Sequence, residues 1–129
     1  PLRLVGSEMC IRDRYYPYMN GQFVFKNAVV RFTEVINAGL KKAGWKPNEI
    51  DMLIPHQANL RIAQFVQKKF GLSDNQVYNN IQRYGNTTAA SIPIALTEAW
   101  EEGKIEKGNK VVLAAFGSGF TWGSIMIQW

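Results

Sequence analysis

Apolar residues recur at intervals of three and four over residues 21–45, "GQFVFKNAVVRFTEVINAGLKKAGW", with polar residues between them. This spacing places the apolar side chains on one face of a helix with about 3.6 residues per turn. We therefore predict a helix in this segment that stops at Gly44, with Pro47 just beyond it. The side chains predicted to face the core are Val29, Phe32, Ile36, Leu40 and Ala43.

The short run "MLIP" at residues 52–55 has no polar position and ends at a proline. A run of this length and composition is typical of a strand that is buried on both faces. A second helical period follows it, and we predict that Asn59 caps this helix and that Gly71 ends it. The inward side chains of the second helix are predicted to be Ala63, Val66 and Phe70.

The last part of the chain alternates between extended and helical patterns. Residues 76–105 begin extended, turn at 84–86, and enter a helix that tolerates Pro93 in its first turn and ends at Gly103. Two strands, 111–116 and 121–128, follow around a glycine-rich link. The resulting order of helix, strand, helix, loop, helix, strand, strand predicts an α/β layered fold with a mostly parallel sheet, as one domain or half of a larger one.

Composition narrows the possible partners. The net charge of +5 favours an acidic partner such as nucleic acid, an acidic protein or phosphates, although a surplus of lysine also serves solubility alone. No apolar run approaches the roughly 20 residues of a membrane span. Cys10 is the only cysteine and His56 the only histidine, so we expect no internal disulfide, no zinc site and a reducing compartment.

Residues 1–14, "PLRLVGSEMCIRDR", have no apolar core and no small-residue cleavage site, so we expect no signal peptide in this segment. The string "VGSEMCIRDR" joins poorly to the residues after it and is similar to translated adapter sequence. We therefore expect residues 1–14 to be non-native, and in that case Cys10 has no function.

Three segments, "PHQAN", "YGNTTAAS" and "FGSGFTWG", end a predicted strand or open a predicted helix. Because ligands in open α/β sheets bind at the carboxyl ends of strands, these segments could converge on one site. His56 is either a satisfied structural histidine or a functional donor, and Asn86 is either a turn residue or a non-titrating donor. The glycines of the last segment suit a tight hairpin or a backbone N–H aimed at a ligand, and the Gly-x-Ser-x-Gly motif of a hydrolase is absent.

Basic residues also follow a helical spacing. Arg61 and Lys68 are seven apart and fall on nearly the same face of the predicted second helix, with Lys69 beside them and Lys26 on the first helix. These charges form either a solvated face or a landing surface for an acidic partner.

The segments "IPHQANLRI", "RYGNTTAASIPIALTEAWEEGKIEKG" and "VLAAFGSGFTWGS" together resemble the C-terminal half of β-ketoacyl-acyl-carrier-protein synthase III, from about Tyr16 to Trp129. The resemblance implies that residues 15–129 form the C-terminal domain of a thiolase-like enzyme, which has two similar α/β halves in αβαβα layers and a mostly parallel mixed sheet. It implies condensation of an acyl-CoA, often acetyl-CoA, with malonyl-acyl carrier protein and loss of CO₂, which initiates fatty acid synthesis. The nucleophilic cysteine of the family lies on the other half, so this chain alone is expected to be inactive.

The resemblance also implies roles for individual residues. His56 and Asn86 would donate hydrogen bonds to the malonyl thioester oxygen and stabilise the enolate left by CO₂. The backbone N–H of Ser118 would belong to an oxyanion hole, although serine replaces the usual glycine and would be strained at positive φ. The substrate-binding residues would be Gly21, Phe25, Ala58, Asn59, Ile62 and Phe116. The carrier-protein-binding residues would be Lys26, Gln57, Leu60, Arg61, Lys68 and Lys69.

Two alternatives to this function stay open. One is a related synthase of secondary metabolism that acts on another acyl-CoA, and the other is a non-catalytic module that binds the carrier protein. In each case we expect no cofactor or metal, no nucleic acid or membrane partner, and a cytoplasmic location. A coenzyme A thioester and acyl carrier protein are the expected partners of the synthase, and the full-length enzyme is expected to be a homodimer.

Overall fold

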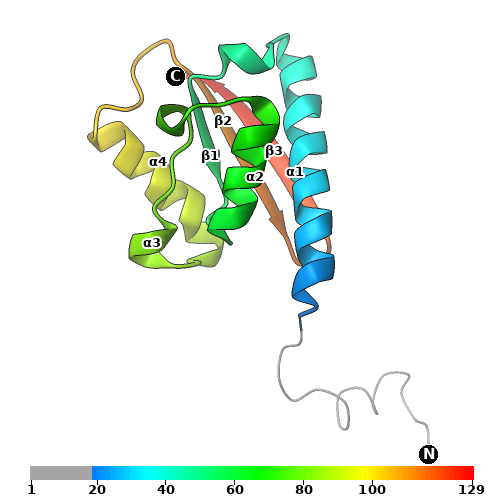
Figure 1. Cartoon of the computed structure of the whole chain (residues 1–129). Helices are drawn as coiled ribbons and strands as arrows, with labels where there is room; N and C mark the ends of the chain where they lie inside the picture. Colours follow the sequence, from blue (N-terminus) through cyan, green and yellow to red (C-terminus); the bar gives the residue numbers. More distant parts are fainter. Residues whose placement is uncertain (1–18) are drawn as a thin grey trace, which may run out of the picture.

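The computed structural model describes residues 19–129 (Figure 1). The prediction that residues 1–14 are non-native therefore lies outside the described residues, as does Cys10.

The centre of the fold is a three-stranded mixed sheet in the order β1-β2-β3. Strand β1 is Met52–Pro55, β2 is Lys110–Gly117 and β3 is Thr121–Gln128. β1 pairs with β2 in parallel, with Leu53 opposite Val112, whereas β2 and β3 are antiparallel. The expected α/β class with a mixed sheet is confirmed. In the described sheet the antiparallel pairing of β2 with β3 is longer than the parallel pairing of β1 with β2. A short glycine-rich turn can join only an antiparallel pair, whereas the parallel pair is joined by a crossover.

Residues 19–129 contain four α-helices, of which α1, α2 and α4 contribute to the core on the sheet: α1 (Gly21–Ala43), α2 (Leu60–Phe70), α3 (Ile81–Tyr84) and α4 (Ser91–Glu101). Single 3₁₀ turns lie before β1, after α2 and before α4. The one-turn helix α3 was not expected from the sequence, which had suggested an extended segment that turns at 84–86. The helices on either side of it lie where the patterns predicted them.

The helix ends follow the sequence signals. The Asn59 side chain accepts a hydrogen bond of 2.9 Å from the backbone N–H of Arg61, which caps α2 as predicted. Gly44 and Gly71 end α1 and α2 with φ of 70° and 66°, a left-handed conformation that glycine adopts without cost. Gly103 follows α4 by two residues, with φ of 68°.

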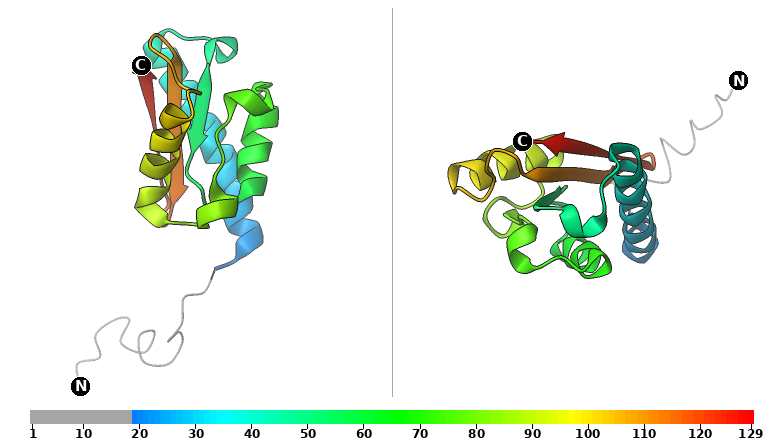
Figure 2. Two further views of the ribbon diagram at one scale, coloured as in Figure 1. Left: turned by 90° about the vertical axis from the view of Figure 1, so that its left-hand side faces the viewer. Right: turned by 90° about the horizontal axis from the view of Figure 1, so that it is seen from above.

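The core has one layer on each face of the sheet (Figure 2). Leu53 packs with α1 and α2 on one face, while Met52 and Ile54 pack with α4 on the other. All four residues of β1 are buried, as the unbroken apolar run predicted. The inward prediction for α1 is confirmed for Val29, Phe32, Ile36 and Leu40.

Two side chains that were predicted to face the core are not buried in it. Ala43 is exposed, because it is the last residue of α1 and the chain turns away at Gly44. Phe70, the last residue of α2, is only half-buried and packs at the margin of the core. Elsewhere α1 lies very close to the sheet, since a Cβ on Gly39 would come within 2.7 Å of Ser124 Oγ.

Candidate active site

His56 is held at the carboxyl end of β1. Its backbone N–H donates to the Ala114 carbonyl at 2.7 Å, which continues the pairing with β2 one residue past the strand. The ring is half-buried, and this burial lowers the pKa of His56 below its ordinary value. The imidazole is therefore neutral at pH 7 and carries one N–H donor.

Ser91, at the start of α4, contacts the His56 ring. Its hydroxyl oxygen lies 2.5 Å from His56 Nδ1 and also accepts from the backbone N–H of Gln57 at 3.3 Å. Ser91 is 2% exposed and is the first residue of α4. It is a site residue that the sequence analysis did not single out, although it lies in the segment "YGNTTAAS" and opens a predicted helix.

The Gln57 side chain forms hydrogen bonds to backbone groups. Its amide nitrogen donates to the carbonyls of Pro55 and Tyr78 at 2.7 and 3.3 Å, and its oxygen accepts from the backbone N–H groups of Asn80 and Ile81 at 3.1 and 3.2 Å. The residue is 3% exposed. The buried amide therefore joins the end of β1 to the start of α3, and the expected contact of Gln57 with a carrier protein stays a prediction.

Asn86 lies in the exposed loop between α3 and α4. Its side-chain oxygen accepts from the Thr88 backbone N–H at 2.9 Å, and its amide nitrogen has no acceptor among residues 19–129. Thr88 has φ of 52°, a conformation that is costly for a β-branched residue and that tends to occur at functional sites. Within residues 19–129, the Asn86 side chain therefore uses its oxygen as an acceptor and leaves its amide N–H groups without an acceptor.

A cleft of about 790 Å³ opens between α1 and α2. Five of the six predicted substrate-binding residues line it, together with Lys26, Arg61 and Asn86. His56 does not line the cleft but comes two residues before Ala58, which does. The predicted lining residues are Gly21, Phe25, Ala58, Asn59 and Ile62, and the sequence analysis missed Met19, Gln22 and Val24. Their part in binding stays a prediction.

The other two predicted contacts lie away from this cleft. Phe116 is 6% exposed, belongs to the core, and packs against Phe120 with ring centroids 4.9 Å apart. Ser118 is exposed in the turn between β2 and β3. The only non-glycine residue with positive φ among those described is Thr88, so serine at 118 brings no backbone strain. Gly119 beside it has φ of 141°, which favours glycine.

The predicted basic surface consists of two groups of side chains. Lys26 and Arg61 lie at the cleft, whereas Lys68 and Lys69 are exposed in the last turn of α2, roughly 10 Å further along the helix axis. None of the four makes an ion pair with a carboxylate in residues 19–129. Leu60 is half-buried at the start of α2.

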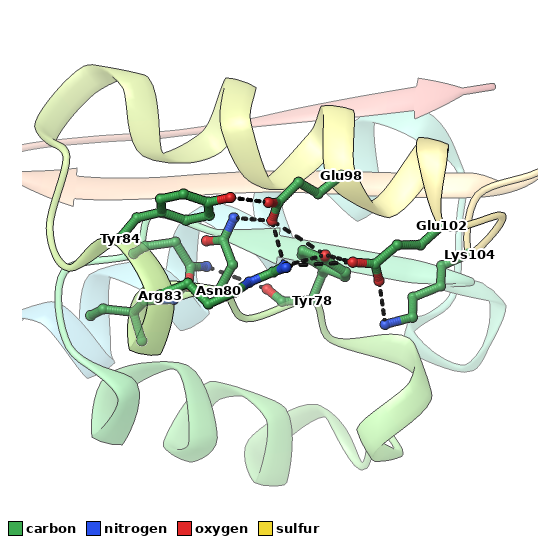
Figure 3. Close-up of polar contacts among 9 residues, drawn as sticks. Tyr78, Asn80, Arg83, Tyr84, Glu98, Glu102 and Lys104 are labelled. Carbon is green, nitrogen blue, oxygen red and sulfur yellow. Dashed lines mark hydrogen bonds and ion pairs between the residues drawn. The ribbon is translucent and has the colours of Figure 1, made fainter.

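A second polar cluster, the Glu98 network, joins the segment before the Asn86 loop to α4 (Figure 3). Glu98 accepts from Asn80 at 2.8 Å, from Arg83 at 2.6 Å and from the Tyr84 hydroxyl. Burial and the hydrogen bond to Glu102 raise the pKa of Tyr78 to about 12. The network members are Tyr78, Asn80, Arg83, Tyr84, Glu98, Glu102 and Lys104.

Two features of the described residues bear on the remaining expectations. Over residues 19–129, no helix combines the length and the apolar character that crossing a membrane requires. Nor do the same residues bring three or more His, Cys, Asp or Glu side chains together in a way that could hold a metal ion. The expectation that the protein needs no cofactor stays a prediction.

The fold and this polar site define a layered α/β domain with a cleft beside the carboxyl end of a central strand. Residues 40–129, more than half of the chain, match the family model "3-Oxoacyl-[acyl-carrier-protein (ACP)] synthase III C terminal". The chain belongs to this family, and the resemblance stated from the sequence is confirmed.

Named relatives and solved structures support this assignment. The chain is 51% identical over 112 residues to the β-ketoacyl-[acyl-carrier-protein] synthase III of Desulfotalea psychrophila, which covers 87% of this chain and 35% of that protein. It superposes with a TM-score of 0.87 and 45% identity on the 3-oxoacyl-[acyl-carrier-protein] synthase III of Aquifex aeolicus, covering 92% of this chain and 38% of that one. The Thermus thermophilus synthase III matches with a TM-score of 0.85, 45% identity and coverage of 87% and 35%. The chain therefore spans about a third of the length of these relatives.

Proposed function

We propose that residues 15–129 form the C-terminal domain of a synthase that joins an acyl-CoA, with acetyl-CoA as the expected starter, to malonyl-acyl carrier protein with loss of CO₂. The family membership and the names of the relatives support this proposal. The observation that carries it for this chain is the position of His56 at the end of β1, two residues before a cleft that also reaches Asn86.

In this reaction His56 and Asn86 donate hydrogen bonds to the thioester oxygen of the malonyl group. Loss of CO₂ leaves an enolate whose negative charge gathers on that oxygen. Two neutral donors stabilise the charge, and one such donor contributes roughly 3–4 kcal/mol in the transition state. The enolate carbon then attacks an acyl-cysteine and forms the new C–C bond, while the cysteine leaves as a thiolate. No residue in 19–129 is a cysteine, so this chain alone is predicted to be inactive in condensation.

The α1–α2 cleft is the proposed path of the pantetheine arm that both substrates carry. Its lining is mainly apolar, and Lys26 and Arg61 bring two positive charges to the cleft. These charges suit the phosphate at the end of the arm and the acidic surface of a carrier protein. Lys68 and Lys69 extend this attraction along α2.

Exposed parts of α1, of β3 and of the turn before β3 are the proposed contact with the rest of the enzyme. Several large apolar side chains of α1, of β3 and of the turn before β3 are exposed among the described residues, and exposed apolar surface typically marks an interface. The exposed side chains are Phe23, Val30, Phe120, Trp122 and Ile125. A homodimer of the full-length enzyme, a cytoplasmic location, and the absence of nucleic-acid and membrane partners stay predictions.

The two alternatives make different demands on this site. A non-catalytic carrier-binding module would use Lys26, Arg61, Lys68 and Lys69 but would need neither the His56 nor the Asn86 donor. A synthase with another acyl-CoA starter would use both donors in the same way.

The test uses a hybrid enzyme that joins the N-terminal part of the Aquifex aeolicus synthase to residues 19–129 of this chain. Acylation of the hybrid's cysteine by acetyl-CoA shows that the hybrid folds, and mass spectrometry follows the decarboxylation of malonyl-carrier protein. We expect the hybrid to decarboxylate, and His56→Ala or Asn86→Ala to lower the rate roughly 100- to 1000-fold with carrier-protein binding unchanged. Ser124→Ala, which removes a hydroxyl bonded to the backbone of α1, is the control.

A hybrid that accepts the acetyl group and yet fails to decarboxylate would contradict the proposal. Full decarboxylation by His56→Ala would contradict the proposed role of His56 in the mechanism.

A further inference from the structure

Ser91 is held rigidly against His56 by the core. It is the first residue of α4, and this helix is anchored on the sheet by Ala95 and Ala99, which are completely buried. Two groups contact its hydroxyl oxygen, the backbone N–H of Gln57 at 3.3 Å and Nδ1 of His56 at 2.5 Å. Neither residue is free to shift, because Gln57 is buried and bonded at both ends of its amide and the His56 backbone is paired to β2.

The protons at this hydroxyl determine which ring nitrogen carries hydrogen. The Gln57 backbone N–H only donates, so it occupies one lone pair of Ser91 Oγ. If His56 Nδ1 also carried a proton, it would donate to the same oxygen. The hydroxyl proton of Ser91, which is 2% exposed, would then have no acceptor among residues 19–129. If Nδ1 is bare, the hydroxyl donates to it and every group has a partner.

We propose that Ser91 is a positioning residue that holds His56 in the tautomer with hydrogen on Nε2 and the ring turned so that Nε2 faces away from Ser91. This proposal rests on the proposed function, because a hydrogen on Nε2 is the donor that the thioester oxygen would meet. The other tautomer would present a lone pair to the developing negative charge and would repel it. Ser91 thus converts a ring with two possible donors into one with a single, directed donor.

The first test is a direct measurement on the unsubstituted hybrid enzyme. Histidine labelled with ¹⁵N distinguishes a bare, pyridine-type nitrogen from a protonated, pyrrole-type nitrogen, and the signals of His56 are assigned by their loss in His56→Gln. We expect a bare Nδ1 and a protonated Nε2. A protonated Nδ1 in the neutral ring would overturn the proposal without any variant of Ser91.

The second test compares Ser91→Ala, Ser91→Thr and the control Ser124→Ala. Removal of an outer partner that orients a metal-ligating histidine typically costs about 10- to 100-fold, and we expect a loss of the same size for Ser91→Ala in kcat of malonyl decarboxylation. KM and carrier-protein affinity should not change, and the ¹⁵N signals should show a mixture of tautomers. Ser91→Thr, which keeps the hydroxyl, should restore the single tautomer and most of the rate.

The outcomes separate this proposal from the proposed function. If His56→Ala abolishes decarboxylation while Ser91→Ala loses no more rate than Ser124→Ala, the role of Ser91 is overturned and the proposed function stands. If His56→Ala decarboxylates at the full rate, the proposed mechanism fails whatever Ser91 does.

Discussion

Two polar regions flank the Asn86 loop, and they differ in how their hydrogen bonds are satisfied. In the Glu98 network, one carboxylate accepts from Asn80, Arg83 and Tyr84, so the donors on α3 and just before it find acceptors on α4. At the candidate site, the Asn86 amide nitrogen has no acceptor within residues 19–129, and neither does His56 Nε2. A polar cluster that satisfies itself holds a fold together, whereas donors left without acceptors are available to a ligand.

The largest effect is expected when a negative charge is placed at the candidate site, where the donors have no acceptor within residues 19–129. Asn86→Asp keeps an oxygen for the Thr88 N–H but replaces the amide donor with a carboxylate beside the proposed enolate. We expect the hybrid enzyme to lose decarboxylation roughly 100- to 1000-fold, because one donor is lost and a like charge is added. Thermal unfolding should barely change, and a rate equal to that of the unsubstituted hybrid would remove Asn86 from the mechanism.

The second prediction concerns Gln57, a buried side chain whose amide groups all have hydrogen-bond partners. Gln57→Leu should leave the backbone groups of Pro55, Tyr78, Asn80 and Ile81 without their partner in a buried place. We expect a loss of about 2–4 kcal/mol in the free energy of unfolding, measured by denaturant titration of the hybrid.

The matched control for this change is Gln64→Leu, on the exposed side of α2. A substitution at such a position should shift the free energy of unfolding by at most about 0.5 kcal/mol. If Gln57→Leu were equally mild and instead weakened carrier-protein binding, the original assignment of Gln57 to the docking surface would be right.

The third prediction uses the pH dependence of the Glu98 network. Hydrogen bonds from Asn80 and Tyr84, with the charge of Arg83, hold the pKa of Glu98 below its ordinary value of 4.5. A lowered pKa in the folded state stabilises the protein fully above pH 4.5, and this contribution is lost as the pH falls through the lowered pKa. Glu98→Gln should therefore be less stable at pH 7 and show a smaller loss of stability on acidification, as followed by thermal unfolding.

Glu101→Gln, on an exposed position of the same helix, is the control for Glu98. Identical acid unfolding of the two variants would show that the network adds nothing to the attachment of α4.

The smallest expected effect is at the far end of α2. Replacement of Lys68 and Lys69 by alanine should weaken carrier-protein binding about two- to fivefold, because exposed charge pairs contribute little. The effect should shrink as salt rises. Lys41 and Lys42 occupy the same last-turn position on α1 and are the matched control. Equal losses from both pairs would mean that the attraction is general and that α2 is not the docking surface.

Much of the fold could be predicted from local patterns. The buried run of β1, the cap at Asn59 and the stops at Gly44 and Gly71 each depend on the chemistry of neighbouring residues, and the structure confirms them. The helix α3 was missed because four residues carry too little periodicity, and its first turn is supported by Gln57 from a distant part of the chain.

Part of the candidate site could also be predicted from the sequence, and part could not. The cleft residues Gly21, Phe25 and Ile62 come from two helices that the pattern predicted, and they line one cavity. The burial of Gln57 was not foreseen, because its place among the carrier-protein-binding residues came from the resemblance and not from a pattern in the chain. Its burial depends on carbonyls and N–H groups more than twenty residues away.

The sequence by itself determined the class of fold, the helix ends and the family, because these follow from periodicity, local capping and recognisable motifs. Only the tertiary structure decided which nitrogen of His56 meets Ser91, which polar side chains are satisfied and which remain available. His56 and Ser91 are thirty-five residues apart, and their contact exists because β1 and α4 pack against each other in the core. Hydrogen-bond partners at that distance are set by packing, on which local sequence patterns carry no information.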